Sequence, residues 1–350
     1  MNDITEQPIL HIGYHKTATT WFQQAFYPEV RGAAFAKRRN VRQAFLCANA
    51  LAFDRDEAMT ALDLPAGKRP IICEEALVGY YENGGFLGTL SKDIAYRIKA
   101  VYPQARIVIF LRNQLDMLVA TYLQYIRRGG TEPLHKFLWP YRYQRRYRTK
   151  PHKKPMFCLE HFAYHRLIFL YRQLFGDTNV HVFLYEDFKA APRDFLRRYC
   201  RELSLDIDID TLSFAATNVT YGTGTYRLAR GLNHVTVGDA VNTTTLLPLM
   251  PRKVNETLMN SLNRTPLAGR KVTPARLFNP RLMDLLTHHF AESNTVLTDE
   301  LGLDLNAYGY PISDPAGSGG PRASDSAYPP APRNAASASA ARSPAGVSGS

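Results

Sequence analysis

The stretch His11-Ile-Gly-Tyr-His-Lys16-Thr-Ala-Thr-Thr20-Trp21 decides the fold class of this chain. Residues 8–14 form a short, mostly apolar run with the composition of a buried strand. A turn rich in hydroxyl groups and holding one lysine follows, and residues 21–26 read as a helix. Such a junction suits a phosphate-like anion, because a helix N-terminus offers unpaired N–H groups and a partial positive charge. Lys16 adds a mobile point charge.

The turn differs from the Walker phosphate-binding loop. The pattern G-x-x-x-x-G-K-[ST] is missing, and Lys16 opens the turn, whereas a Walker loop places its lysine near the end. The sequence therefore indicates an anion site of another type.

Strand-like and helix-like segments alternate along the chain. Strands are expected at 9–14, 70–73, 105–111 and 179–185. Helices are expected at 115–126, 157–175, 192–203 and 278–301, with Gly129-Gly130 ending the first and Gly176 the second. This alternation predicts an α/β fold: a P-loop-like three-layer domain with a central, mainly parallel sheet and a helical C-terminal third.

The composition changes abruptly near residue 313. Residues 313–350 are rich in Ala, Ser, Pro and Gly. Such a segment cannot bury enough apolar surface to offset its ordering entropy. We therefore predict one domain over residues 1–312 and a disordered tail over 313–350.

Most of the net charge of +12 belongs to one segment. Residues 127–154 hold ten Lys and Arg against a single acid, Glu132, interleaved with aromatic residues. We interpret 127–156 as an insertion in the domain. Three interpretations of this segment remain open. It is a docking surface for an anionic or glycan-like acceptor, a nucleic-acid contact, or a solvated loop.

The remaining composition favours a cytoplasmic protein. Four cysteines are scattered without a C-x-x-C pair, so reduced thiols are expected and a zinc site is not. His11 and His15 fall on strand and loop rather than on one helical face, so no metal is predicted. We expect no secretory signal and no membrane span.

A second strand-to-helix junction lies at residues 105–113. It places Arg112 after a strand, at the sheet edge where open α/β folds bind ligands. An arginine at that position can hold a phosphate group through two hydrogen bonds.

Together the two junctions resemble those of the PAPS-dependent sulfotransferases, particularly the bacterial members. The family's 5′-phosphosulfate loop reads as a strand followed by Pro/His-Lys-[Ser/Thr]-Gly-Thr-[Thr/Ser], and here the loop is His15-Lys16-Thr17-Ala18-Thr19-Thr20. The family's 3′-phosphate element is an arginine after a strand and a serine eight residues on, here Arg112 and Ala120-Thr121-Tyr122. Weaker similarities lie at 182–188 and 290–305, so the resemblance covers about residues 8–311.

The resemblance implies roles for these residues. Lys16 would neutralise the leaving phosphate, with His15, Thr17, Ala18, Thr19 and Thr20 around the 5′-phosphate. Arg112 would bind the 3′-phosphate, with Ala120 or Thr121 beside it, and Tyr221 and Arg227 would belong to a segment over the same end. Two residues depart from the pattern: Ala18 replaces a glycine and Ala120 replaces the serine.

The acceptor's proton requires a base. Glu74 and Glu75 follow the strand at 70–73, and the resemblance aligns Glu75 with the family's catalytic glutamate. Repulsion between adjacent carboxylates could raise the pKa of one of them. Glu74 as the base, and a structural role for both residues, are the alternatives.

The resemblance thus implies an enzyme that transfers the sulfuryl group of PAPS to a hydroxyl or amine, without a metal. Carbohydrate, lipid-linked glycan, phenol and peptide tyrosine remain open as acceptors. A P-loop nucleotide or sugar kinase is the enzymatic alternative, although neither a Walker loop nor a magnesium-binding carboxylate is evident. A nucleic-acid-binding protein is the other alternative, but it would leave the paired Lys16 and Arg112 elements unexplained.

Overall fold

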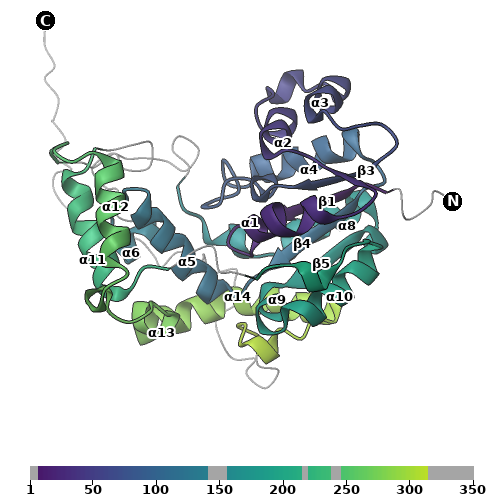
Figure 1. Cartoon of the computed structure of the whole chain (residues 1–350). Helices are drawn as coiled ribbons and strands as arrows, with labels where there is room; N and C mark the ends of the chain where they lie inside the picture. Colours follow the sequence, from purple (N-terminus) through teal and green to yellow (C-terminus); the bar gives the residue numbers. More distant parts are fainter. Residues whose placement is uncertain (1–6, 141–155, 215–219, 238–245, 314–350) are drawn as a thin grey trace, which may run out of the picture. The chain divides into compact units, whose positions relative to one another are not determined.

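Five parallel strands form the central sheet, in the order β2-β3-β1-β4-β5 (Figure 1). The computed structural model describes residues 7–140, 156–214, 220–237 and 246–313. The strands are β1 (Ile9–Gly13), β2 (Ala33–Phe35), β3 (Arg69–Cys73), β4 (Arg106–Leu111) and β5 (Val180–Leu184). The register places Leu10 of β1 beside Ile72 of β3 and Ile107 of β4.

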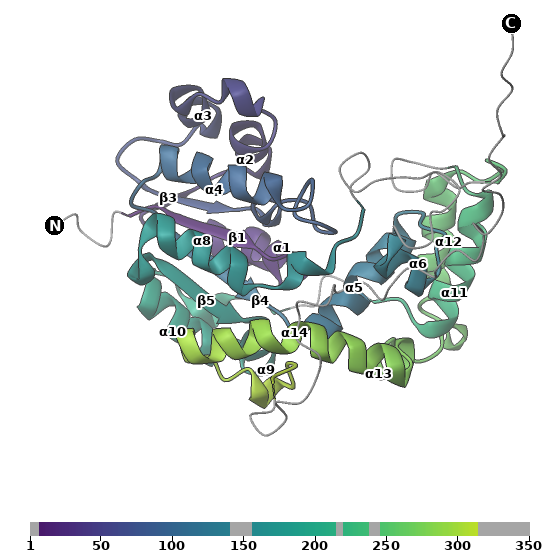
Figure 2. The same ribbon diagram turned by 180° about the vertical axis from the view of Figure 1, so that it is seen from behind.

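Helices cover both faces of the sheet, as its mostly apolar and buried strands require. One face packs on a continuous helical segment made of α1 (Thr19–Trp21), a π-helical turn (Phe22–Phe26) and a 3-10 turn (Tyr27–Glu29), and on α9 (Tyr185–Ala190) and α10 (Pro192–Leu203). The other face packs on α4 (Thr89–Val101), α5 (Gln114–Arg127), α8 (His165–Phe175) and α14 (Pro280–Leu301). Opposite views show α1 in front of the sheet in Figure 1 and α8 in front in Figure 2. The predicted three-layer α/β fold is confirmed.

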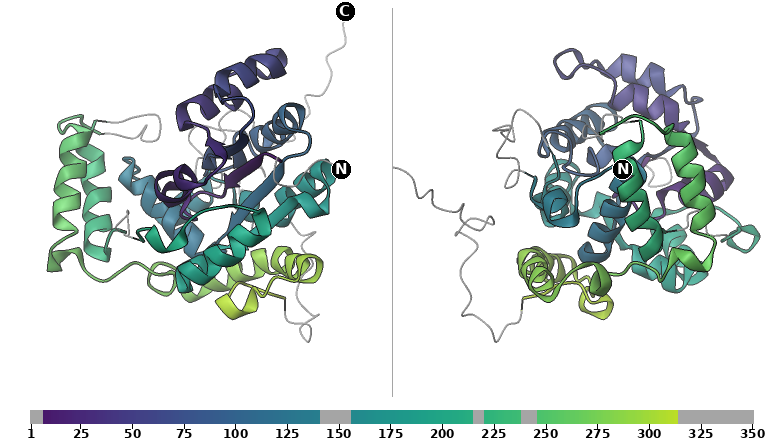
Figure 3. Two further views of the ribbon diagram at one scale, coloured as in Figure 1. Left: turned by 45° about the vertical axis from the view of Figure 1, so that its right-hand side comes forward. Right: turned by 90° about the vertical axis from the view of Figure 1, so that its left-hand side faces the viewer.

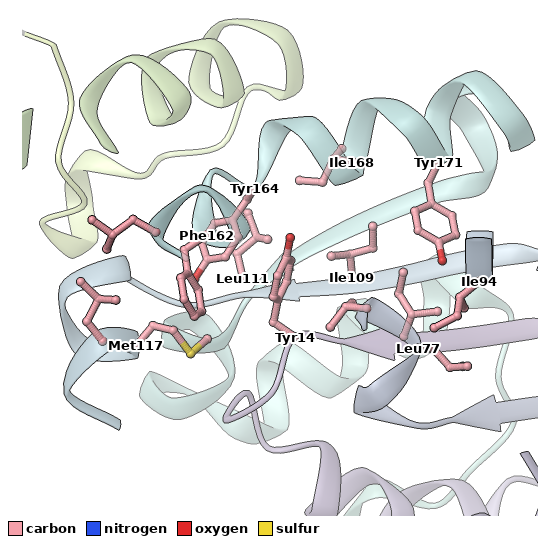
Figure 4. Close-up of a cluster of buried hydrophobic side chains, with 14 of the residues drawn as sticks. Tyr14, Leu77, Ile94, Ile109, Leu111, Met117, Phe162, Tyr164, Ile168 and Tyr171 are labelled. Carbon is pink, nitrogen blue, oxygen red and sulfur yellow. The ribbon is translucent and has the colours of Figure 1, made fainter. Parts of the chain in front are cut away.

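The larger core lies between the sheet and α8. Figure 4 shows Ile168 and Tyr171 of this helix facing Ile109 of β4, with Tyr14 between the sheet and the helix. The rings of Tyr14 and Tyr164 are 4.6 Å apart. This packing holds the segment that follows β1 against the body of the domain.

The remaining helices cluster before β3, after α5 and in the C-terminal third. They are α2 (Arg38–Phe45), α3 (Arg55–Leu62), α6 (Leu134–Leu138), α11 (Thr223–Leu232), α12 (Arg252–Leu262) and α13 (Pro274–Leu277). Short 3-10 turns lie at Ala50–Ala52, Glu75–Val78, Leu159–Phe162, Asp177–Asn179, Ile209–Thr211, Asn233–Val235, Pro266–Ala268 and Asn306–Tyr308. Figure 3 shows α11 and α12 side by side, and the predicted helical character of the C-terminal third is confirmed.

Several elements differ from the sequence-based prediction, which expected no helix at the positions of α2 and α3. The three-residue edge strand β2 was not expected. A single helix over 157–175 is wrong, because a 3-10 turn ends at Phe162 and α8 begins only at His165. The backbone leaves helical geometry at Ala163, where ψ is 76°. The next residue, Tyr164, donates its hydroxyl to the Arg112 carbonyl at 2.8 Å.

The central part of the basic segment, 141–155, and the predicted tail, apart from its first residue, lie outside the described residues. The domain boundary at 312/313 therefore stays a prediction. Among the helices that the structure describes, none has the length and apolar character needed to cross a membrane.

Candidate functional site

The strand order places the ends of β1 and β4 together. From the central β1 the chain builds β2 and β3 on one side and then β4 and β5 on the other. The carboxyl ends of β1 and β4 thus meet where the winding direction reverses, which is where open α/β sheets bind ligands. Lys16 follows β1 and Arg112 follows β4. The Arg112 Nη1 atom donates to the Lys16 carbonyl at 3.1 Å, so the two junctions are in direct contact.

A cavity of about 710 Å³ opens at this point. Its lining comes from the Lys16 turn, α5, the segment 185–192, Phe214 and the segments 220–221 and 271–273. Five cationic residues of the described part of the chain line it: Lys16, Arg112, Arg127, Lys189 and Lys271. Among the described residues that line it, only Asp116 is acidic. This excess of positive charge suits a ligand with several negative charges.

A hydrogen bond within the protein positions the Lys16 ammonium. Its side chain is exposed toward the cavity, and its Nζ atom donates to Gln124 Oε1 at 2.7 Å. Desolvation lowers the pKa of this ammonium most, and the guanidinium groups of Arg127, Arg128 and Arg112 lower it further, to about 8. The carboxylate of Glu75 acts in the opposite direction.

The turn after β1 has a left-handed backbone at two residues that are not glycine. Lys16 has a φ of 64° and Ala18 a φ of 66°. Ala18 is therefore not in ordinary helix-entry geometry, and its Cβ carries a conformational cost of about 1 kcal/mol that glycine would avoid. Its carbonyl accepts from the Trp21 N–H at 2.8 Å, which starts the helical segment that begins at Thr19.

The cavity gathers seven of the predicted site residues: Lys16, Ala18, Thr19, Thr20, Arg112, Ala120 and Tyr221. The other predicted residues lie elsewhere. Thr17 is buried and donates its hydroxyl to the Tyr14 carbonyl, so it shapes the turn. Thr121 is also buried, consistent with the rotation of roughly 100° per helical residue that separates it from Ala120. Arg227 is exposed on α11, away from the lining.

Sequence reasoning did not assign several lining residues to the site. Arg127 was noted only as part of the basic segment, and no motif marked Lys189 or Lys271. An aromatic wall was also missed: Trp21 stacks on Phe214, with ring centroids 5.3 Å apart and planes at 15°, and Phe188 lies beside Trp21 at 5.1 Å. Such a wall offers a flat surface to a planar ring.

The two adjacent glutamates have different surroundings. Glu74 is fully buried and accepts from Arg38 Nε at 2.7 Å and Arg42 Nε at 3.0 Å. Burial alone would raise the pKa of its carboxyl, but the hydrogen bonds from these arginines outweigh burial and keep the pKa below its usual value. The expected rise through like-charge repulsion therefore does not occur at Glu74.

Glu75 packs against the end of β1. Its carboxylate accepts from Gln23 Nε2 at 3.0 Å and pairs with Arg38. Its backbone also packs on Gly13: an added Cβ there would lie 3.1 Å from the Glu75 Cα, and Gly13 has a φ of 108°. This approach brings Glu75 beside the Lys16 turn, although not into the lining of the cavity.

Among the residues that the structure describes, no group of three or more His, Cys, Asp or Glu side chains could hold a metal ion.

No protein-family model matches the chain, and no curated protein matches its sequence. Solved structures are similar to it in fold. A sulfotransferase from Alicyclobacillus acidocaldarius superposes with a TM-score of 0.50 at 17% identity, over 86% of this chain and 98% of that protein. The mouse sulfotransferase SULT7A1, solved in complex with PAP, gives a TM-score of 0.42 at 14% identity, over 87% and 88% of the two chains.

The bacterial structure shows that this chain has the sulfotransferase fold. The resemblance predicted from the two junctions is thereby confirmed at the level of the fold.

Proposed function

We propose that the protein is a sulfotransferase that uses PAPS as its sulfuryl donor. The observation that carries this proposal is the meeting of Lys16 and Arg112 in one cationic cavity at the switch point of a sulfotransferase fold. PAPS has a phosphosulfate at its 5′ end and a phosphate at its 3′ position, so its binding requires separate cations. The cavity supplies five cationic side chains.

The lining residues divide into three parts that suit such a nucleotide. Lys16, Thr19 and Thr20 at the start of the helical segment would hold the 5′ end, where helix N–H groups and the lysine both favour negative charge. Arg112 would bind the 3′-phosphate. The wall made of Trp21 and its aromatic neighbours offers a stacking surface for the adenine.

PAPS, when bound, supplies an activated sulfuryl group. Lys16 would stabilise the negative charge that develops on the departing phosphate, as positioned cations do in phosphoryl transfer. The acceptor oxygen forms a bond to sulfur, the bond from sulfur to the phosphate oxygen breaks, and the acceptor's proton passes to a base. Glu75 is the proposed base. For that role its carboxylate must exchange one of its contacts with Gln23 and Arg38 for the acceptor.

The acceptor is proposed to dock on the basic segment of the chain. The prediction that residues 127–154 dock an anionic or glycan-like acceptor concerns a segment whose centre lies outside the described residues, and it stays a proposal. No nucleic acid is required, because the cavity accounts for part of the basic character of the chain. A cytoplasmic location likewise stays a proposal.

A thermal-shift panel tests the proposal. Adenosine 3′,5′-bisphosphate (PAP) should raise the melting temperature without magnesium, and more strongly than AMP or ATP. At a ligand concentration of about 100 times Kd, linkage adds about 2.7 kcal/mol to the free energy of unfolding. A kinase would instead prefer ATP with magnesium. A larger shift with ATP than with PAP would therefore refute the proposal.

A further inference from the structure

Several exposed apolar side chains gather on and before α12, and none of them lines the cavity. They are Leu246, Leu247, Leu249, Val254 and Leu258, and they are called here the α12 surface. A single exposed leucine is ordinary on a protein surface. In the described part of the chain, however, eight of the fifteen exposed large hydrophobic side chains fall within residues 228–267. Such a concentration indicates a surface that another molecule covers.

Hydrogen bonds fix the backbone that carries these side chains. The Leu249 N–H donates to the Val235 carbonyl at 3.0 Å, which ties the segment before α12 to the end of the α11 region. Asn255 of α12 donates its Nδ2 atom to Asn233 Oδ1 at 3.0 Å, so this side of α12 faces the α11 region. The apolar residues are therefore presented in a defined arrangement.

The outer side of α12 is apolar where a surface helix would ordinarily be polar. Val254 and Leu258 lie one turn apart, so their side chains share one side of the helix, and both are exposed. Met259 is buried and belongs to the side that packs on the rest of the domain. A helix that only covered the core would carry polar residues opposite Met259. Val254 and Leu258 are thus not explained by the folding of the domain.

Positive charge accompanies the apolar residues. Between residues 246 and 273 the chain has five Lys and Arg against one acid, Glu256. The Glu256 carboxylate lies 3.9 Å from the guanidinium of Arg127, which offsets its charge. Lys253 on the first turn of α12 and Arg264 just beyond its end are both exposed. The partner of this surface therefore has to be apolar and negatively charged.

Three kinds of partner have to be compared. A second copy of the chain would place positive charge against positive charge across a two-fold interface, which is unfavourable. A folded acidic protein would need a separate pocket for each protruding leucine, and the exposed fractions of Leu246 and Leu249 are 74% and 73%. A fluid lipid layer surrounds such side chains without a preformed shape, and anionic headgroups attract lysine and arginine. The lipid layer fits both properties.

We propose that the α12 surface docks the protein on a lipid bilayer that contains anionic phospholipids. The apolar side chains of the surface enter the boundary between headgroups and acyl chains, while Lys253 and Arg264 stay at the level of the phosphates. Docking of this kind lies in the plane of the interface and needs no spanning segment. The inference does not depend on the proposed function, because it uses none of the residues that line the cavity.

Co-sedimentation of the full chain with lipid vesicles tests the inference. Vesicles of phosphatidylcholine with added phosphatidylglycerol should bind the protein, and high salt should weaken this binding. Vesicles of phosphatidylcholine alone should bind it less. Leu249→Ser should lower the partition coefficient about tenfold, because it removes apolar area that the lipid buries. Leu51→Ser is the matched control and should leave binding unchanged, since Leu51 is 99% exposed but lies between α2 and α3.

A second pair of variants tests the contribution of charge. Lys253→Gln should lower the partition coefficient about fivefold, which is the effect of one elementary charge near an anionic surface. Lys68→Gln, at an exposed lysine just before β3, is the matched control and should bind as the wild type does. All four substituted side chains are exposed, so the melting temperatures of the variants should equal that of the wild type.

Equal binding to both kinds of vesicle would overturn the inference. Binding that Lys253→Gln weakens and Leu249→Ser does not would also overturn it, because the basic segment 127–154 would then account for the attraction. Binding to neither kind of vesicle would overturn it as well, and sedimentation velocity would then separate the other partners. A dimer that Leu249→Ser dissociates would assign the surface to a second copy, and a monomer would favour an acidic protein.

Discussion

The lowered pKa of Lys16 makes the affinity for PAP dependent on pH in a defined direction. Desolvation and three neighbouring guanidinium groups bring this pKa to about 8 in the free protein. The nucleotide favours the ammonium form, so its binding weakens as the pH rises through that value and Lys16 loses its proton. Relative to affinity well below pH 8, we expect binding to be about tenfold weaker at pH 9 and about thirtyfold weaker at pH 9.5.

Isothermal titration of PAP between pH 7.5 and 9.5 measures this dependence. The phosphate groups of the ligand stay ionised over the range, because their second pKa is about 6. Lys16→Arg is the matched control: the guanidinium stays charged, so its profile should be flat even if its affinity is lower. A flat wild-type profile, or an equal slope in Lys16→Arg, would show that Lys16 does not hold the nucleotide.

Three further predictions follow from the site. Arg112→Ala should weaken PAP binding by about 10- to 100-fold and AMP binding much less, because only PAP has the 3′-phosphate; equal losses in calorimetry would contradict this role. Ala18→Gly should raise the free energy of unfolding, measured in urea, by about 0.5–1 kcal/mol, because glycine adopts the left-handed backbone without strain. The control Ala25→Gly, within a helical turn, should lower it, and a destabilised Ala18→Gly would refute the argument. Glu74→Ala should cost about 3 kcal/mol of stability, because it removes the partner of Arg42 and one of the two carboxylate partners of Arg38, whereas Glu75→Gln should mainly lower kcat, by about 10²–10⁴; the reverse pattern would exchange their roles.

The local pattern was sufficient to predict elements with strong periodicity. α10 has the predicted bounds, Pro192–Leu203, because its apolar spacing and its first-turn proline agree. The three-residue strand β2 carries too few residues to show a period. The break before α8 falls at Ala163, whose ψ of 76° is not helical, and no glycine or proline within 157–175 marks it.

The candidate site was predictable where a motif follows a strand. Lys16 and Arg112 were found because each stands just after a strand, and the strand order then brings them together. Thr17 has the same chemistry as Thr20, and only the geometry of the turn separates a fully buried residue from a partly exposed one that lines the cavity. Lys271 reaches the cavity through long-range packing, so composition alone could not place it.

The hydrogen bond between Lys16 and Gln124 has a consequence for the speed and selectivity of the site. A lysine has four flexible carbons, and aiming its ammonium normally costs entropy at the moment of binding. Here the amide on α5 holds the ammonium in place while leaving its other two hydrogens for a ligand. Folding therefore preorganises the direction of the Lys16 ammonium. An anion that binds only when this ammonium leaves Gln124 has to break that hydrogen bond and binds more weakly.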